Sequence, residues 1–176
     1  MMTYTQHYDS PLGGILLAAD EEGLTGLWFD GQKYFARTLP KEYAESETPV
    51  LCEAKRWLDI YFSGREPDFT PPLHPEGSAF QQAVWALLLE IPYGATTTYG
   101  TLARKLAEKQ GLTHMSAQAV GGAVGHNDIS LIIPCHRVVG ANGSLTGYAG
   151  GVDKKIKLLE LERADMKAFF VPKKGT

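Results

Sequence analysis

The sequence contains little cysteine. Its 176 residues include only Cys52 and Cys135, which lie far apart and form neither a CxxC pair nor the Cys/His spacing of a zinc finger. This argues against a disulfide framework and a structural zinc site. We therefore expect two free thiols, no metal or cofactor, and a reducing, cytoplasmic environment. Cys52 falls in a predicted helix, where we expect core packing because free cysteine is among the most buried residue types.

The sequence has no excess of positive charge and no long apolar runs. The chain has 17 Lys and Arg against 20 Asp and Glu, which gives a net charge of −3. A nucleic-acid-binding protein usually carries a basic excess, so any contact with DNA must use a local face. No run is long enough to span a bilayer, and the N-terminus lacks the basic and apolar regions of a signal peptide. We expect no membrane contact and, by default, a monomer.

What the chain does have is enough apolar residues, 44% of the total, to bury a core. The first half alternates short apolar runs such as “GGILLAAD” and “GLTGLWFD” with glycine and acidic residues, as a β-hairpin does. “TPVLCEAKRWLDIYFSG” then has helical spacing and ends at Gly64. Four prolines between positions 67 and 75 mark a boundary. We predict an α/β (α+β) protein with domains at 1–75 and 76–176, the second mostly helical.

The second half opens with three predicted helices. Ser78 and Gln81 form a capping box before “FQQAVWALLLEIP”, whose nearly all-round apolar surface predicts a central, buried helix. “TTTYGTLARKLAEKQG” and “SAQAVGGAVG” follow, and Ser116 caps the second of them. Two short helices joined by a brief polar turn indicate a helix-turn-helix.

The last of these helices is unusually rich in small residues. Gly121 and Gly122 each cost about 1 kcal/mol relative to alanine in a helix interior, and Ala117, Ala119 and Ala123 flank them. Composition alone favours close packing against another helix. The alternative is a helix whose backbone approaches nucleic acid, for which the narrow minor groove suits better than the major groove.

The stretch “IPCHRVVG” places Cys135 beside a histidine. A thiol attacks as thiolate and needs a base, for which His136 is the nearest candidate. Neighbours on a strand point to opposite faces, so the pair needs a bridging water or a sharp turn after Pro134. A tyrosine-phosphatase loop would have arginine where this chain has Ala141, and the papain and caspase signatures are missing. A packed thiol and another kind of cysteine hydrolase remain alternatives.

Beyond the cysteine, the sequence predicts a turn, a loop and a last helix. Asn142–Gly143 is a hairpin-turn dipeptide, and Gly150–Gly151 indicates a close-approaching loop that carries Tyr148. “VDKKIKLLELE” has helical periodicity, and the tail “VPKKGT” is expected to fray.

Several of these motifs together resemble one known family. “AVGGAVGHN”, “IPCHRVVG”, “GYAGG” and “KLLELE” occur in the order and spacing of the active-site half of the O6-alkylguanine-DNA alkyltransferases, also called methylated-DNA-protein-cysteine methyltransferases. The similarity runs from about Phe80 to Glu162. More weakly, “SPLGG” and the strands after it resemble the family's N-terminal ribonuclease-H-like β-sheet domain, which takes no direct part in transfer. The zinc ligands of some members are not evident, so no metal is assigned.

The resemblance implies a function. Such a protein binds duplex DNA containing O6-alkylguanine through the minor groove, flips the damaged guanine out of the stack, and moves the alkyl group irreversibly onto its own cysteine. The rival is a non-catalytic, alkyltransferase-like damage-binding protein, which carries another residue, commonly tryptophan, at the cysteine position. The presence of Cys135 disfavours this rival.

The resemblance also assigns roles to single residues. Cys135 corresponds to the alkyl acceptor, His136 to the base that reaches it through a water, and Glu162 to the acid that orients the histidine. Without the resemblance, Glu162 would be taken for a solvated charge at a helix end. Asn127 corresponds to an asparagine of the thiol network. The family usually has proline after it and this chain has Asp128, so we expect a looser turn.

The base pocket and the DNA-binding face are assigned in the same way. Tyr99 corresponds to the tyrosine that hydrogen-bonds the flipped guanine and helps to rotate the phosphate. The pocket is implied to consist of Tyr148, Ala149, Gly150, Val124 and Val138, and the DNA-binding residues to be Thr98, Ala117, Gln118, Ala119, Gly121 and Gly122. Gln118 stands where many members have an arginine that fills the gap left by the flipped base.

Overall fold

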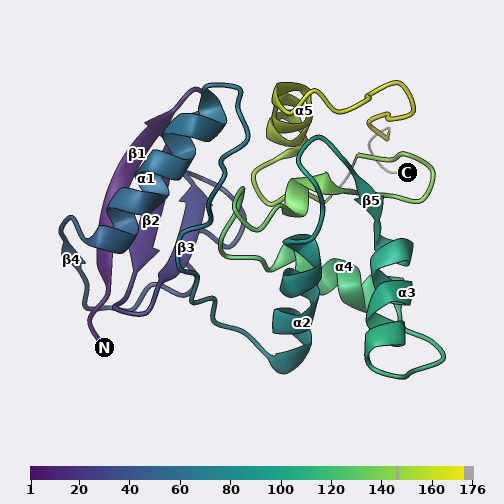
Figure 1. The fold of residues 1–176 in the computed structure, drawn as a ribbon, viewed down its shortest axis with the longest axis horizontal. Coiled ribbons are helices and arrows are strands. Elements are labelled where there is room, and N and C mark those ends of the chain that lie inside the picture. The colour runs from purple at the N-terminus through teal and green to yellow at the C-terminus, as the bar shows by residue number, and fades with distance from the viewer. Residues whose placement is uncertain (146, 173–176) are drawn as a thin grey trace. The chain divides into compact units, whose positions relative to one another are not determined.

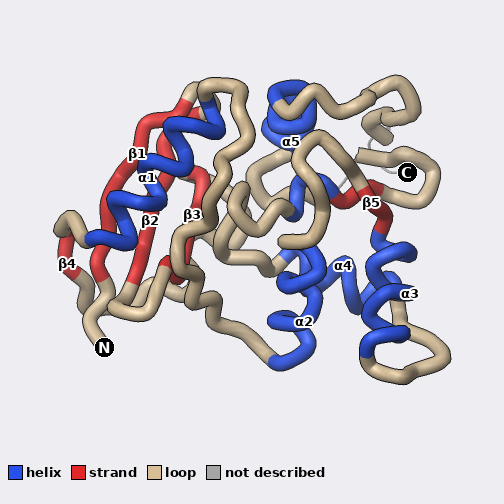
Figure 2. The backbone as a smooth tube through the Cα atoms, in the orientation of Figure 1, coloured by secondary structure: helices blue, strands red, loops and turns tan. Residues whose placement is uncertain are grey.

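The computed structural model describes residues 1–145 and 147–172 and divides into two compact units. The first consists of Met1–Glu76 with Asp128–Ile132, and the second of the described residues of Gly77–Asn127 and Ile133–Thr176. The predicted α/β fold, an N-terminal sheet followed by a mostly helical part, is confirmed (Figures 1 and 2). Residues 128–132 lie within the predicted second domain by sequence but belong with the first unit. Most of the tail predicted to fray lies outside the described residues.

The first unit is a four-stranded sheet with one helix. Its strands are β1 (Tyr4–Ser10), β2 (Gly13–Ala19), β3 (Leu24–Phe29) and β4 (Ala44–Glu45), in the order β3-β2-β1-β4. The β1–β2 and β2–β3 pairs are antiparallel and β1–β4 is parallel. Residues 15–19 of β2 are all buried, which places the core on the central strands.

Helix α1 (Pro49–Phe62) begins at a capping side chain followed by a proline. The hydroxyl of Thr48 caps it, and Pro49 occupies its first turn, where a missing N–H costs nothing. Its buried residues are Leu51, Ala54, Trp57, Leu58 and Tyr61. Cys52 is exposed, so the expectation of a core cysteine is wrong. The reason is helical periodicity, because the position after Leu51 is turned about 100° away from the buried stripe.

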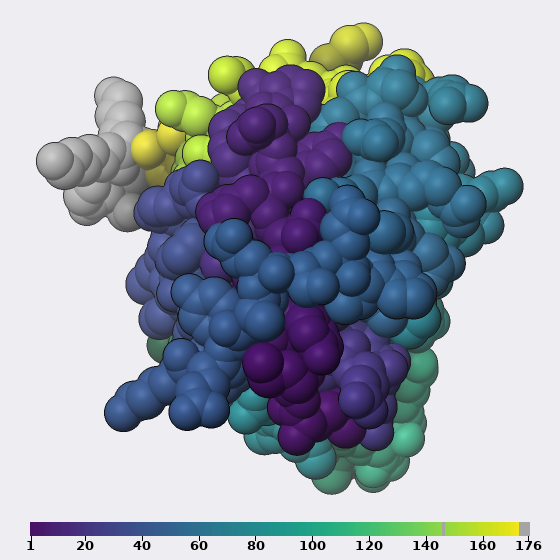
Figure 3. Space-filling view, turned by 90° about the vertical axis from the view of Figure 1, so that its left-hand side faces the viewer, coloured from purple at the N-terminus to yellow at the C-terminus, as the bar shows by residue number. Residues whose placement is uncertain are grey.

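Side chains connect β1 with α1 on the surface of this unit. The Tyr8 hydroxyl donates to Asp59 Oδ1 at 2.6 Å, and Lys55 Nζ donates to Gln6 Oε1 at 2.7 Å. In Figure 3 the atoms of the first strand (purple) and of the segment that includes α1 (blue) form one continuous surface. Polar pairs therefore cover the outer edge of this sheet–helix contact.

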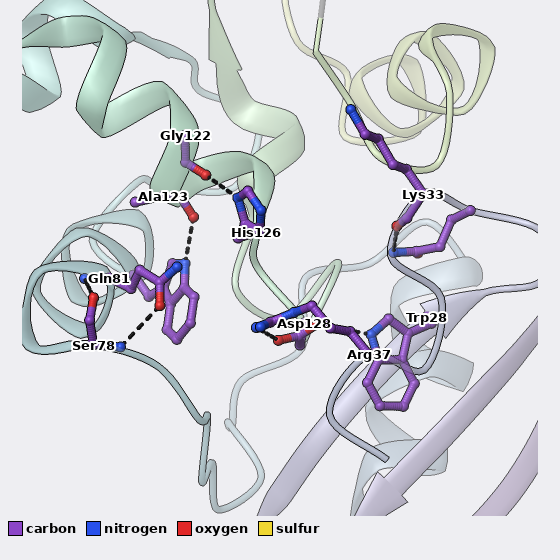
Figure 4. A network of polar contacts seen from close by, with 11 residues as sticks. Trp28, Lys33, Arg37, Ser78, Gln81, Gly122, Ala123, His126 and Asp128 are labelled. Atoms are coloured by element: carbon purple, nitrogen blue, oxygen red, sulfur yellow. Dashed lines mark hydrogen bonds and ion pairs between the residues drawn. The ribbon is translucent and has the colours of Figure 1, made fainter. Parts of the chain in front are cut away.

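Residues 128–132 add to the edge of the sheet at β3. The Leu27 amide donates to Asp128 O at 2.8 Å, and the Ser130 amide donates to Leu27 O at 3.1 Å. The buried Asp128 carboxylate accepts hydrogen bonds from Trp28 Nε1 and from the Arg37 guanidinium (Figure 4). The residue that stands in place of the family's proline is therefore fixed by two side-chain hydrogen bonds, and the looser turn stays a prediction.

The second unit holds the remaining elements. They are α2 (Ala79–Leu88), β5 (Thr97–Thr98), α3 (Tyr99–Lys109), α4 (Ala117–Gly125), the 3-10 helix η1 (Cys135–Arg137), β6 (Val138–Val139) and α5 (Val152–Leu161). Helices α2, α3 and α4 pack against one another, and β5 pairs with β6 in parallel. Trp85 Nε1 of α2 donates to Ala123 O of α4 at 2.9 Å, inside this helical core.

In the second unit the predicted helix caps are confirmed, but the predicted burial of α2 is not. The capping box of Ser78 and Gln81 is confirmed (Figure 4), as is the Ser116 cap of α4. The prediction that α2 is buried all round is wrong, since burial is confined to the second half of the helix. Its buried residues are Val84, Trp85, Leu87 and Leu88, whereas Ala79 and Ala86 are exposed.

Within the described residues, no helix is long and apolar enough to cross a membrane.

Candidate active site

Cys135 and His136 lie on a tight turn. Pro134 has φ −83° and ψ 67°, and the Cys135 amide donates to Ile133 O at 2.8 Å, which is the geometry of an inverse γ-turn. The 3-10 helix follows at once, so the two side chains do not alternate as they would on a strand. Cys135 is 8% exposed and His136 is fully buried. The sharp turn after Pro134 that the sequence allowed is therefore present.

His136 is oriented by Glu162. Its Nε2 lies 2.6 Å from Glu162 Oε2, and both side chains are buried. Because an ionised carboxylate only accepts, we assign the proton to Nε2, which leaves Nδ1 as the acceptor. Nδ1 is buried and has no hydrogen-bond partner among the described residues. Burial lowers the pKa of His136, although Glu162 partly opposes this, so the imidazole is neutral near pH 7 and able to take a proton.

Glu162 is held in its ionised form by neighbours of opposite charge. Burial alone would raise the pKa of Glu162, but hydrogen bonds and charge from His136 and Arg137 outweigh it and hold the pKa well below its usual range. Arg137 Nε donates to Oε1 at 2.8 Å, and the Gly94 amide donates to the same oxygen at 3.1 Å. Arg137 Nη1 also donates to Ile91 O at 2.8 Å. Oε2 of the carboxylate therefore contacts the histidine, and Oε1 accepts the hydrogen bonds from Arg137 and Gly94.

The pKa of the Cys135 thiol is raised above its ordinary value, because burial outweighs the groups that stabilise the thiolate. Burial raises its pKa, while a hydrogen bond from Asn127 and the positive charge of Lys155 act in the opposite direction. Asn127 Nδ2 also donates to Ile133 O at 2.7 Å and so fixes the backbone just before the turn at Pro134. Asn127 thus lies where it can contact both the turn and the sulfur.

Lys155 and Arg137 are the site residues that sequence analysis missed. Lys155 is 1% exposed, and its Nζ donates to Val138 O at 2.6 Å. Burial lowers the pKa of Lys155 to about 8, opposed by the attraction of Cys135. A signal for Lys155 existed, because it precedes the buried Leu158 and Leu159 by three and four residues and so shares their helix face. A lysine on an apolar face is rarely left buried without a reason.

Two tyrosines lie close to the thiol and the histidine. The rings of Tyr148 and His136 meet edge to face, with centroids 6.5 Å apart. A Cβ on Gly121 would lie 3.6 Å from the ring of Tyr99, and a Cβ on Gly147 would lie 3.4 Å from its hydroxyl. Burial raises the pKa of Tyr99, and a charge on Cys135 raises it further. The phenol of Tyr99 is therefore a neutral donor held between α4 and the Tyr148 loop.

The other implied pocket residues surround the same turn. Val124 and Val138 are buried, whereas Ala149 and Gly150 are partly exposed. The Val138 amide donates to Cys135 O, and its carbonyl accepts from Lys155. These pocket assignments stay predictions.

Helix α4 exposes several of its small residues, although Ala123 is buried and Gly121 is partly buried. Ala117, Gln118, Ala119 and Gly122 are all exposed, and a Cβ on Gly122 would meet nothing within 4 Å. Close packing against another helix, the alternative favoured by composition, does not explain Gly122. Thr98, the other residue predicted to contact DNA outside α4, is the N-cap of α3. Its hydroxyl accepts a hydrogen bond from the Thr101 amide at 3.1 Å.

Among residues 1–145 and 147–172, no three His, Cys, Asp or Glu side chains are grouped so that they could hold a metal ion.

Comparison with known proteins gives the same family over both halves of the chain. The family model described as “6-O-methylguanine DNA methyltransferase, DNA binding domain” matches residues 79–164, and that of the “ribonuclease-like domain” matches residues 3–75. A methylated-DNA--protein-cysteine methyltransferase of Methanosarcina acetivorans is 46% identical over 160 residues, which cover 90% of this chain and 97% of that protein. The protein of the same name from Haemophilus influenzae is 42% identical, covering 91% and 86%.

Solved structures agree. The O6-methylguanine methyltransferase of Mycobacterium tuberculosis superposes with a TM-score of 0.77 at 41% identity, covering 92% of this chain and 93% of that one. The M. tuberculosis protein in complex with DNA gives a TM-score of 0.76 at 40% identity, covering 93% and 95%. The resemblance inferred from the sequence motifs is thereby confirmed. This chain belongs to the 6-O-methylguanine DNA methyltransferase family.

Proposed function

We propose that the protein repairs O6-alkylguanine in duplex DNA by transferring the alkyl group to its own Cys135. The observation that carries the proposal is the buried His136–Glu162 pair beside this cysteine, with Nδ1 of the imidazole left as an acceptor. Relatives that cover most of the chain are named for transfer to a protein cysteine, which supports the same chemistry.

The transfer has a simple balance of bonds and protons. His136 Nδ1 takes the thiol proton through a water, and Glu162 stabilises the imidazolium that forms. The sulfur then attacks the alkyl carbon, the bond from that carbon to O6 breaks, and guanine leaves with the electron pair. Tyr99 donates a hydrogen bond to the departing base. The base takes up one proton from solvent while the imidazolium returns the thiol proton to solvent, so no net proton is gained or lost. The C–S bond of the thioether resists hydrolysis, so each molecule acts once.

Contact with DNA falls to α3 and α4 as a helix-turn-helix. The exposed small residues of α4 allow its backbone to enter the minor groove, with Ala117, Ala119 and Gly121 beside Gly122. Gln118 is exposed on the same helix and would fill the gap left by the flipped base. Glutamine is shorter than arginine and neutral but keeps a donor and an acceptor. Thr98 lies at the start of α3, where it would approach a phosphate.

The remaining expectations concern the state of the protein rather than its chemistry. A monomer that works in the cytoplasm without membrane contact remains the proposal. The free Cys52 and Cys135 support only the reducing compartment.

A duplex with one O6-methylguanine tests the function against its rivals. Excess duplex is incubated with the protein, and restored guanines are counted per protein molecule. We expect one restored guanine for each molecule and no further turnover. A damage-binding protein would retain the duplex and restore none, and a cysteine hydrolase would leave the duplex unchanged while cleaving an ester or amide.

Gly122→Ala separates the stability of α4 from its contact with DNA. Alanine should stabilise the helix by about 1 kcal/mol, because the new methyl meets nothing within 4 Å. The same methyl should weaken duplex binding about tenfold. Thermal melting and duplex titration measure the two effects. Gly125→Ala, at the last position of α4 and also in open space, is the control. Unchanged duplex affinity in Gly122→Ala would show that this backbone does not approach DNA.

Lys155→Met should shift the pH dependence of transfer to more alkaline values. The lysine cation lowers the pKa of Cys135, so its loss raises that pKa further. Since one pKa unit changes the thiolate fraction tenfold, the rate near neutral pH should fall about 10- to 100-fold. The difference in transfer rate between Lys155→Met and wild type should narrow above pH 8. The pKa of Lys155 is lowered to about 8, so the wild-type protein also loses this cation there.

Single-turnover rates across pH measure this shift. Lys157→Met, an exposed lysine of the same helix, removes an equal charge and should leave the profile unchanged. A uniform loss at every pH in Lys155→Met would mean that the lysine supports the fold and not the thiolate.

A further inference from the structure

The chain reverses direction directly after Glu162. Arg163 has φ +60°, its amide donates to Glu160 O at 2.9 Å, and the Ala164 amide donates to Leu159 O at 3.0 Å. A residue other than glycine in this left-handed region is uncommon. The reversal sends residues 164–170, here called the C-terminal strap, back over the second unit. The strap therefore starts at the carboxylate that orients His136.

The far end of the strap pairs with the loop that follows β6. The Leu145 amide donates to Phe170 O at 2.8 Å, and the Phe170 amide donates to Gly143 O at 3.1 Å. Gly143 has φ +89°, and a Cβ there would lie 2.1 Å from Ala168 O. Glycine at 143 is thus required twice, by its backbone conformation and by the closeness of the strap.

Apolar side chains fill the space under the strap. Val139, Leu145 and Leu159 form a buried cluster, and the partly buried side chains packed against it include Ala164, Met166 and Phe169 of the strap together with Val152 and Ile156 of α5. β6, the loop after it and α5 all contribute to the cluster. The strap closes this small core from outside.

Both ends of the strap therefore adjoin the candidate active site. The loop fixed at Gly143 and Leu145 runs on to Gly147, which lies against Tyr99, and to Tyr148, which lies against His136. We propose that the strap, with Phe169 as its principal contact, is a positioning element that holds the Tyr148 loop ready for a flipped base. This inference rests on the proposed function. It assigns the strap to substrate binding, not to activation of the thiol.

The adjacent residues Phe169 and Phe170 give a matched pair of variants. The side chain of Phe169 packs on the cluster, whereas that of Phe170 is 45% exposed and contributes through its backbone. Phe169→Ala should raise the duplex concentration at half-maximal transfer about tenfold, which is a 1.4 kcal/mol loss of binding. Its rate at saturation should stay within about twofold of wild type, and the pH of half-maximal rate should shift by less than about 0.3 pH unit. Phe170→Ala should behave as wild type, and Phe169→Leu should recover most of the loss.

A second variant changes the loop residue that the strap packs against. Gly143→Ala places a methyl against Ala168 O, while Gly111→Ala has a similar left-handed φ of +68° and nothing within 4 Å. Both carry the backbone strain, but only Gly143→Ala displaces the strap. Hydrogen exchange followed by mass spectrometry should show faster exchange in residues 147–151 for Gly143→Ala and Phe169→Ala, with no change in α4. This readout does not depend on any activity.

The exchange and transfer measurements together test whether the strap is a positioning element. Faster exchange with a raised half-saturation concentration supports the strap as a positioning element. Unchanged exchange in residues 147–151, or a loss confined to the saturating rate with a shifted pH midpoint, would overturn it. If wild type restores no guanine, the proposed function fails, and the exchange result alone then shows whether the strap orders the loop.

Discussion

We expect Cys135→Ser to abolish alkyl transfer while leaving duplex binding nearly intact. A serine hydroxyl is far less acidic than a thiol, so the same neutral imidazole cannot ionise it. The substitution also fits the site, because Cys135 is only 8% exposed and serine is the smaller residue. The DNA-binding face proposed on α4 is untouched by the change. Restored guanines per protein molecule and duplex affinity are the two measurements.

The control for this variant is Cys52→Ser. Cys52 is exposed on α1, so its loss should change neither quantity and would show that thiol removal as such is harmless. Stoichiometric transfer by Cys135→Ser at a rate close to wild type would remove Cys135 from the role of acceptor.

The second large effect is expected from the histidine and its carboxylate. His136→Ala and Glu162→Gln should each slow transfer by about 10² to 10⁴ without abolishing it, since each removes one part of a proton relay. The double variant should lose little more than the worse single one, because both act on one thiol through the 2.6 Å contact. Single-turnover rates at saturating duplex measure these losses.

Glu162→Gln needs a control for folding, because the carboxylate also accepts from Arg137 and Gly94. Glu160→Gln alters an exposed acid of the same helix and should be silent. Thermal melting of each variant separates a rate loss from unfolding. Losses that add fully in the double variant would show that His136 and Glu162 do not form one relay.

Much of the fold follows from local sequence signals. The capping box before α2, the Ser116 cap of α4 and the apolar stripe of α1 each depend on residues three or four apart, and each is present. Cys52 shows the limit of such reasoning. A general tendency of cysteine to be buried was applied to it, although its position relative to Leu51 already placed it off the stripe.

What could not be predicted depends on contacts between distant parts of the chain. Residues 128–132 join the sheet of the first unit through Leu27 and Trp28, about a hundred positions away. Helical periodicity already placed Lys155 on the buried face of α5, but its hydrogen bond to the Val138 carbonyl has no local motif. The close approach of the strap to Gly143 has none either. The site residues Cys135, His136 and Glu162 were assigned through the family's motifs, since Glu162 alone had the pattern of a solvated charge.

The central claim is that Cys135 itself receives the alkyl group. The measurement that tests it most directly is the mass of the intact protein after incubation with an O6-methylguanine duplex, followed by digestion to find the modified residue. The account predicts a gain of one methylene unit in each active molecule, located on the peptide that contains Cys135. An unchanged mass while the duplex is bound, or a gain on any other residue, would contradict it.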